Sequence, residues 1–206
     1  MVCLAKTKAA SIYAIEPLIG YKVIKDKFHN DSQRIKVINK AGDEFIIEEK
    51  LDFILSIGVI HHIHQPDPVL LNCRNNLKDN GKILIWLYGR RGNYIYLFLI
   101  TLLRTFTPFI PDYLLKILVD ILYLPLTLYI KLSSHIKLPM RGYMLNVIGR
   151  MDPESQKQII FDQLNPIYSK YYKEREVFNL LNKNGFKNIK IHRRQGYSYT
   201  ATATKN

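Results

Sequence analysis

Three histidines stand close together in this chain, and they are the residues best suited to chemistry. His61, His62 and His64 follow an apolar run over residues 51–57. A histidine at this place could remove a proton from the hydroxyl group of a bound molecule, or it could simply shape a pocket. A metal site would need a carboxylate or a further ligand nearby, and none is evident. We therefore predict no metal site.

An acidic residue, Glu16, provides a second candidate site. It follows residues 11–15, which read as a short strand, and it precedes Pro17. An acidic side chain at the carboxyl end of a strand in an α/β sheet is well placed to accept hydrogen bonds from a ribose diol. Taken alone, however, a glutamate before a proline is more often a surface residue that ends a strand.

The elements that must position these residues are two short apolar runs, residues 51–57 and 82–87. Each is long enough for a strand and too short for an ordinary buried helix, and both read as interior parallel strands. Residues 66–77 between them carry apolar side chains on one helical face, and Gly81 is expected to end that helix in the left-handed conformation. A strand, helix, strand unit predicts an α/β fold with a mainly parallel sheet.

The same segment resembles a known family. Its two halves read LDFILSIGVIHHI and NNLKDNGKILI. They are similar to the fourth and fifth strands of class I S-adenosylmethionine-dependent methyltransferases, with Asp79-Asn80 in place of the usual Pro-Gly of the following turn. The resemblance covers residues 11–90 and 173–204. It implies a Rossmann-like fold, S-adenosylmethionine as cofactor, and methyl transfer to a small-molecule acceptor, which could be lipid-like.

The resemblance also implies site residues. It assigns the cofactor site to Glu16, Pro17, Gly42, Asp43, Ile57 and Gly58. In the family, the acidic residue that closes the second strand holds the ribose, and a loop similar to the one around Asp43 borders the adenine. An ordinary Gly-Asp turn explains that loop equally well. His61 and His62 are the catalytic candidates near the acceptor, although holding the two substrates in line could suffice without a base.

One part of the family pattern is missing. The first strand of the family and its Gly-rich turn would lie upstream of Leu4, and no GxGxG occurs in the chain. We therefore expect an N-terminally truncated domain. A truncated, non-catalytic methyltransferase remnant is accordingly an alternative function.

The middle of the chain, residues 93–150, is expected to be a helical insertion that forms a lid over the substrate. Residues 94–103 and 113–130 are almost wholly apolar. The first run is too short to span a membrane, and the second contains Lys116, Asp120 and Pro125. We therefore predict helices that pack on the sheet or on one another. Basic residues near the ends of these runs could also favour a membrane surface, and a basic peripheral membrane protein is a further alternative.

The last part, residues 151–206, is expected to close a single domain whose core units lie in residues 1–92. Residues 173–184 have the pattern of a helix capped by Gly185. Residues 186–193 and 197–204 alternate apolar and polar side chains across Gln195-Gly196, which predicts an antiparallel hairpin.

Composition limits the class of partner. The 206 residues include 30 Lys and Arg against 17 Asp and Glu, and this excess favours an anionic partner. The lysines are scattered, and no platform of aromatic and basic side chains for single strands stands out, so we expect no specific nucleic acid. Cys3 and Cys73 show neither disulfide nor zinc spacing, which fits a cytoplasmic protein, either free or associated with a membrane. The oligomeric state is left open.

Overall fold

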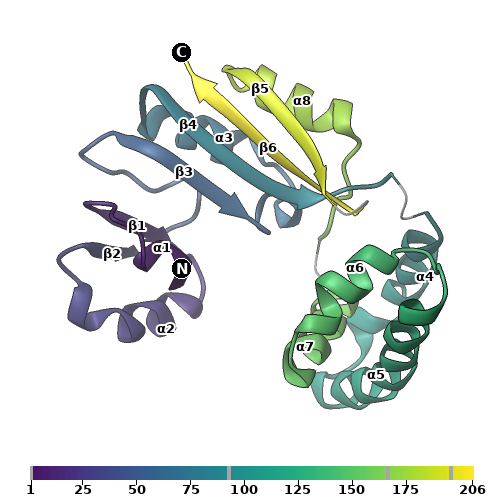
Figure 1. The fold of residues 1–206 in the computed structure, drawn as a ribbon. Helices are drawn as coiled ribbons and strands as arrows, with labels where there is room; N and C mark the ends of the chain where they lie inside the picture. Colours follow the sequence, from purple (N-terminus) through teal and green to yellow (C-terminus); the bar gives the residue numbers. More distant parts are fainter. Residues whose placement is uncertain (1, 92–93, 166–167, 195–196) are drawn as a thin grey trace.

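The computed structural model describes residues 2–91, 94–165, 168–194 and 197–206. Figure 1 shows three parts: a small N-terminal lobe, a larger sheet with helices beside it, and a separate group of helices. We call the last of these the helical unit.

The N-terminal lobe combines two short parallel strands with two helices. Its elements are α1 (Val2–Ala5), β1 (Ile12–Ile15), α2 (Gly20–Lys27), a 3₁₀ turn (His29–Asp31) and β2 (Ile35–Ile38). Ile12 lies opposite Ile35 in the β1–β2 pair. The strand expected at residues 11–15 is therefore confirmed.

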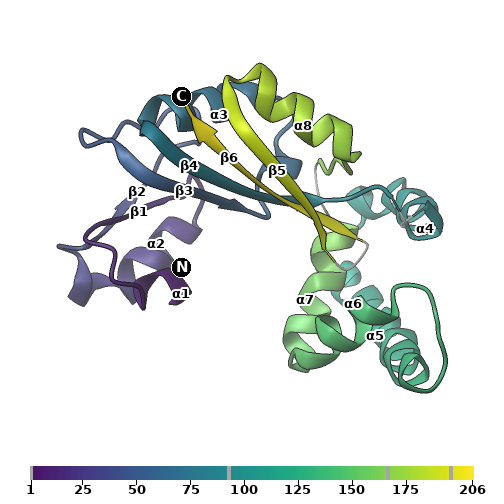
Figure 2. The ribbon, with the colours of Figure 1, turned by 45° about the horizontal axis from the view of Figure 1, so that its top comes forward.

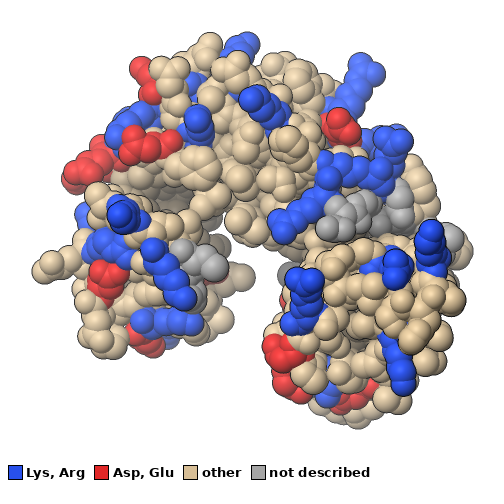
Figure 3. All heavy atoms as spheres, viewed as in Figure 1, with Lys and Arg blue, Asp and Glu red and all other residues tan. Residues whose placement is uncertain are grey.

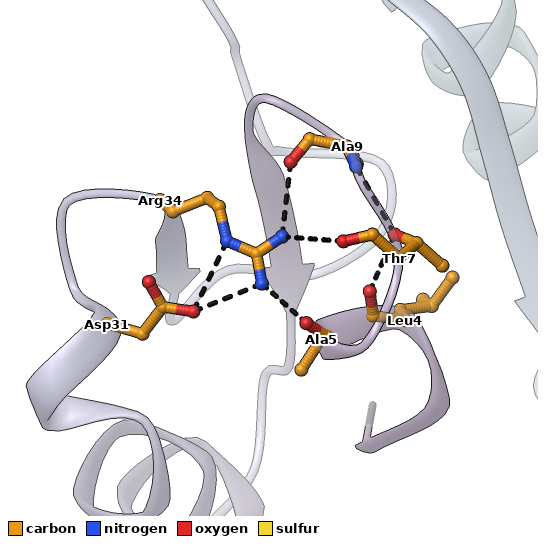
Figure 4. A network of polar contacts seen from close by, with 6 residues as sticks. All are labelled: Leu4, Ala5, Thr7, Ala9, Asp31 and Arg34. Carbon is orange, nitrogen blue, oxygen red and sulfur yellow. Dashed lines mark hydrogen bonds and ion pairs between the residues drawn. The ribbon is translucent and has the colours of Figure 1, made fainter.

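Arg34 ties the chain before β1 to the start of β2 (Figure 4). Its guanidinium Nη1 donates to the carbonyl oxygens of Thr7 and Ala9, both at 3.1 Å, and Nη2 donates to the carbonyl of Ala5. The carboxylate of Asp31 lies 3.1 Å from Nη2 on the other side. Arg34 thus donates hydrogen bonds to three backbone carbonyl groups that take part in no strand pairing among the described residues.

The larger sheet has the order β3-β4-β6-β5. Its elements and their helices are β3 (Leu51–Ile57), α3 (Asp67–Asn76), β4 (Leu77–Tyr88), α8 (Glu174–Lys183), β5 (Phe186–Arg194) and β6 (Ser198–Lys205). β3 and β4 are parallel, whereas β6 is antiparallel to both β4 and β5. The α/β class, the closing helix and the antiparallel hairpin are confirmed. The sheet is mixed, however, and not mainly parallel. The expected turn at Gln195-Gly196 lies outside the described residues.

The main core lies on one face of this sheet. Ile83, Ile85 and Leu87 alternate along β4 and are fully buried, together with Leu70 of α3 and Leu181 of α8. Figure 2 shows α3 and α8 side by side along the sheet. Because side chains of a strand alternate between faces, one face of β4 makes most of the core.

Two predictions for the strand, helix, strand unit are wrong in detail. β3 was expected to be an interior strand, but it pairs only with β4 among the described strands, and Phe53 and Ile57 are exposed. Gly81 was expected to cap the helix with a positive φ, but Asn80 takes that conformation, with φ 63°. Gly81 lies within β4, where an added Cβ would meet the carbonyl oxygen of Lys78 at 2.8 Å. Close backbone contact, and not backbone handedness, therefore requires glycine there.

The helical unit has its own core. It contains α4 (Tyr94–Arg104), α5 (Asp112–His135), α6 (Arg141–Asn146) and α7 (Pro153–Leu164), with 3₁₀ turns at Thr107–Phe109 and Ile148–Arg150. Ile100, Leu115, Val119 and Leu164 form the buried centre. The prediction that these helices pack on one another is confirmed. The unit extends past residue 150, because Leu164 of α7 belongs to its core.

Candidate functional site

The ends of β3 and β4 hold the histidines. Gly58 directly follows β3 with φ +77°, a left-handed conformation that favours glycine, and its N–H donates to the carbonyl of Trp86 at 3.1 Å. The chain then turns into a 3₁₀ helix, Ile60–His62, beside the end of β4. Ile57, the residue before the turn, is 62% exposed. The predicted Ile57, Gly58, His61 and His62 therefore lie together.

His61 is fully buried among aromatic rings. Its ring lies 3.9 Å from that of Tyr88 and 4.3 Å from that of His62, centre to centre. Among the described residues, neither ring nitrogen has a hydrogen-bond partner. Burial and, to a smaller extent, the nearby charge of His62 lower the pKa of His61 to about 3. His61 is therefore a neutral imidazole near pH 7 and a weak base.

His62 is exposed and has a fixed orientation. Its Nδ1 lies 2.9 Å from the carbonyl oxygen of Tyr168, and the backbone N–H of Lys170 donates to the carbonyl of His61. Because a carbonyl only accepts, the neutral His62 ring carries its proton on Nδ1 and leaves a lone pair on Nε2. Of the two histidines, His62 is the one whose ring is exposed.

Glu16 lies where the sequence predicts it, at the carboxyl end of β1. Its Oε1 accepts from the backbone N–H of Leu18 at 3.0 Å, and its carbonyl accepts from the side chain of Asn39, which follows β2. Pro17 is exposed beside it. The carboxylate is thus held at the joint edge of the β1–β2 pair.

Gly42 and Asp43 belong to the loop that follows β2. The carbonyl of Gly42 accepts from the side chain of Asn72 in α3 at 3.1 Å. An added Cβ at Gly42 would lie 2.9 Å from a methyl group of Val69, so this position has no room for a side chain. Asp43 is exposed.

The predicted residues thus form two groups. Glu16, Pro17, Gly42 and Asp43 lie at the ends of β1 and β2, and the other four lie at the ends of β3 and β4. No hydrogen bond joins these two groups within the described ranges, because β1 pairs only with β2 and β3 only with β4. No cluster of three His, Cys, Asp or Glu side chains suited to a metal occurs in that part of the chain either.

A cavity of about 180 Å³ opens between the helical unit and the end of β4. We call it the aromatic cavity. Its walls are mostly aliphatic and aromatic side chains from α4 to α7, closed at one end by tyrosines and one amide. The lining residues used below are Tyr88, Tyr96, Leu122, Leu126, Gln163 and Tyr171.

Gln163 organises the polar end of the aromatic cavity. Its Oε1 accepts from the hydroxyls of Tyr96 at 2.6 Å and Tyr171 at 3.0 Å, and its Nε2 donates to the hydroxyl of Tyr88 at 2.8 Å. Burial raises the pKa of Tyr88 and of Tyr96, so both remain neutral phenols. Tyr88 and Tyr171 stack at 5.2 Å. This end can offer hydrogen bonds to one polar group of an otherwise apolar molecule.

Comparison with known proteins identifies the domain. Residues 2–85 match the family model described as a methyltransferase domain. Residues 2–85 therefore carry the sequence of a methyltransferase domain. The match covers β1 to most of β4, which includes all eight predicted site residues. No curated protein matches the chain.

Solved structures share the fold at low sequence identity. A methyltransferase from Thermotoga maritima, described as a possible histamine N-methyltransferase, has a TM-score of 0.52 at 13% identity over 95% of this chain and 73% of its own. Human N-acetylserotonin methyltransferase with bound S-adenosylmethionine has a TM-score of 0.53 at 11% identity over 99% of this chain and 43% of its own. An O-methyltransferase family protein from Burkholderia thailandensis scores 0.53 at 8% identity over 95% and 44%. The chain therefore spans less than half the length of the last two.

Sequence reasoning missed the aromatic cavity, and Gln163 was not singled out. The available signal was an amide at the end of a helix, next to a tyrosine-rich segment, since a half-buried amide must find partners. The partners of Gln163 come from α4, β4 and the segment after α7. These segments lie far apart in the chain, so a local sequence pattern does not predict that they meet.

Proposed function

We propose that the protein transfers a methyl group from S-adenosylmethionine to a small, largely apolar acceptor held in the aromatic cavity. The main support for this proposal is the position of Tyr88. Its ring contacts that of His61 at 3.9 Å, and the same residue lines the cavity. A single aromatic ring thus separates the histidines at the end of the parallel strands from a pocket for an acceptor.

The residues at the ends of β1 and β2 fit the nucleoside part of the cofactor. Glu16 uses Oε1 for the Leu18 N–H, and the structure describes no partner for Oε2, which remains able to accept from a ribose hydroxyl. Gly42 keeps its loop free of side chain next to α3. When bound, S-adenosylmethionine supplies a reactive methyl group on a positively charged sulfur.

His62 is proposed as the residue that takes the proton from the acceptor. The Tyr168 carbonyl holds its ring so that Nε2 carries the lone pair. His61, with its pKa near 3, is proposed to shape the site as a neutral ring. The hydroxyls of Tyr88 and Tyr171 would orient the polar group of the acceptor from inside the cavity.

The character of the cavity supports a lipid-like acceptor. Apart from the group around Gln163, its walls are aliphatic or aromatic. A pocket of this kind selects an apolar body and one polar end. Such molecules partition into membranes, so we propose a cytoplasmic protein that makes peripheral contact with a membrane.

Replacing Glu16 tests the cofactor site. We expect Glu16→Ala to weaken S-adenosylmethionine binding by roughly ten- to a hundredfold, because it removes charge-assisted hydrogen bonds to the ribose. Glu16→Gln keeps an acceptor for the Leu18 N–H and should lose less. Titration calorimetry on the three proteins measures the effect, with the exposed Glu48→Ala as control. Equal affinities in all four would show that Glu16 does not hold the ribose.

Methyl transfer itself is tested with a labelled methyl group. The protein is incubated with methyl-labelled S-adenosylmethionine and a cellular lipid extract, and label is counted in the organic phase. We expect label there, and we expect His62→Ala to lower the rate about 10²- to 10⁴-fold, as for loss of a general base. His64→Ala serves as control. A protein that binds the cofactor but labels no extractable molecule would contradict the acceptor class.

One observation favours a second candidate, a methyltransferase remnant without activity. β1 and β3 are not hydrogen-bonded to each other in the described structure, and the sequence contains no GxGxG turn to approach the cofactor with backbone N–H groups. The same calorimetry distinguishes the candidates. No measurable cofactor binding by the unsubstituted protein would favour the remnant.

A further inference from the structure

The outer face of α5 is largely apolar, with charged side chains beside its apolar residues. Six exposed apolar side chains follow at steps of three or four residues: Tyr113, Ile117, Ile121, Leu124, Leu128 and Leu132. This spacing places them in one stripe along the helix, about 30 Å long. We call it the α5 stripe. Leu115 and Val119, on another side of α5, are buried in the core of the helical unit. An apolar face that turns away from the core needs a partner other than water.

The charges around the α5 stripe are mainly basic. Residues 94–150 contain six basic residues against two acidic ones: Arg104, Lys116, Lys131, Lys137, Arg141 and Arg150 against Asp112 and Asp120. Asp120 forms an ion pair with Lys157 of α7 at 2.8 Å, so its negative charge is balanced within the helical unit. Lys116, Lys131 and Lys137 are exposed. In Figure 3 the helical unit, at lower right, is mostly uncharged, with Lys and Arg at intervals and Asp and Glu toward its left and lower edges. An apolar stripe with basic side chains beside it is the pattern of a helix at an anionic membrane surface.

We propose that the α5 stripe docks on the surface of an anionic lipid bilayer. The apolar side chains enter the region between headgroups and acyl chains, and Lys116, Lys131 and Lys137 lie near the lipid phosphates. The inference rests on the outer face of α5 alone, so it holds whether or not the protein transfers a methyl group.

α5 lies on the bilayer and does not cross it. By length and composition it is the one helix in the described part of the chain that could cross a membrane. Crossing, however, would withdraw Leu115 and Val119 from the core of the helical unit and would separate Asp120 from Lys157. It would also bring Lys116 and Lys131 toward the hydrocarbon, at a cost of several kcal/mol. Lying flat keeps all of these contacts.

The docked orientation places the aromatic cavity near the bilayer. Leu122 and Leu126 line the cavity from α5, the helix that carries the stripe on its outer side. An apolar molecule in the bilayer would therefore have one helix between it and the cavity. This gives the lipid surface a second use, as the source of the acceptor.

Flotation with lipid vesicles tests the docking. The full chain is mixed with vesicles of phosphatidylcholine and phosphatidylglycerol in equal parts, or of phosphatidylcholine alone, and centrifuged through a density gradient. We expect the protein to float with the mixed vesicles and to bind the neutral ones at least tenfold more weakly. Added salt should weaken binding to the mixed vesicles, because it screens the attraction of the lysines.

Variants separate the stripe from the charges. Ile117→Ser with Leu124→Ser should weaken binding to the mixed vesicles by about tenfold or more, since two buried apolar side chains are lost. Val23→Ser with Phe178→Ser removes equally exposed apolar side chains from α2 and α8 and should change nothing. Lys131→Gln with Lys137→Gln should weaken binding to mixed vesicles by roughly ten- to thirtyfold and leave the neutral vesicles unaffected. Circular dichroism confirms that each variant is folded.

Four outcomes would overturn the proposal. The first is no flotation of the unsubstituted protein with mixed vesicles. The second is equal flotation of the stripe variant. The third is resistance of membrane-bound protein to extraction by alkaline carbonate, which would show that α5 crosses the bilayer. The fourth is a dimer that does not float and that the stripe substitutions convert to a monomer, which would assign the α5 stripe to a second copy of this chain.

Discussion

The protein is expected to lose stability in mild acid, and replacing His61 with phenylalanine should remove most of that loss. His61 has a pKa of about 3 in the folded state, because burial disfavours its charged form, against an ordinary value of 6.5. The unfolded chain therefore binds a proton below pH 6.5 that the folded protein does not bind until about pH 3. The stability that this neutral ring contributes is present above pH 6.5 and is lost as the pH falls toward 3.

Between pH 7.5 and pH 4.5 this group alone should lower the free energy of unfolding by roughly 2 to 3 kcal/mol. Urea unfolding at the two pH values measures the difference. The His61→Phe variant, which keeps a ring against Tyr88, should lack most of it, while the exposed His192→Phe should retain it. The lower pH stays above the ordinary carboxyl value of 3.8, so Asp67, whose pKa is lowered mainly by a hydrogen bond from Lys183, contributes little. An unchanged difference in His61→Phe would mean that His61 can take up a proton in the folded protein.

Replacing Gln163 with leucine is expected to destabilise the attachment of the helical unit to the sheet. The amide forms hydrogen bonds with the hydroxyls of Tyr96, Tyr171 and Tyr88. Leucine has a similar size but would leave these three hydroxyls without that partner. Since each unsatisfied buried polar group costs about 1 to 3 kcal/mol, and this site is only partly buried, we expect a loss of about 2 to 4 kcal/mol.

Thermal and urea unfolding of Gln163→Leu measure this loss, and limited proteolysis shows whether the helical unit opens first. Gln158 in the same helix provides a matched control. It is exposed and donates only to Asp162, so Gln158→Leu should change the free energy of unfolding by less than about 0.5 kcal/mol. If both variants were equally stable, the hydroxyls around Gln163 would have other partners, such as water in the cavity.

Local patterns were sufficient for most elements of the fold. Residues 51–57 were predicted as a strand and form β3 with the same limits. A short apolar run is long enough for a strand and too short for an ordinary buried helix. The helix before Gly185 was also found, and that glycine does take a positive φ, of 80°. The error at Gly81 arose because a turn glycine and a glycine in close backbone contact look alike in sequence.

Tertiary relations were not accessible in the same way. The pairing of Tyr88 with His61 and the contacts of Gln163 join segments that lie far apart in the chain, so only the folded structure shows them. The edge position of β3 was missed for a related reason. An apolar strand sequence is compatible with burial on both faces, but it does not specify which neighbours are present.

The separation of the two strand pairs has a consequence for cooperativity. Among the described residues, no backbone hydrogen bond joins β1 or β2 to the larger sheet, and the partly buried side chains of Tyr13, Ile15 and Ile38 pack against its core. A unit attached through side chains alone can open while the rest of the molecule stays folded. The N-terminal lobe would then unfold or detach as a separate cooperative unit, while the contacts of Arg34 stabilise the lobe itself. Glu16 lies in that unit and the histidines in the other, so the two halves of the site would be in register only while the lobe is closed.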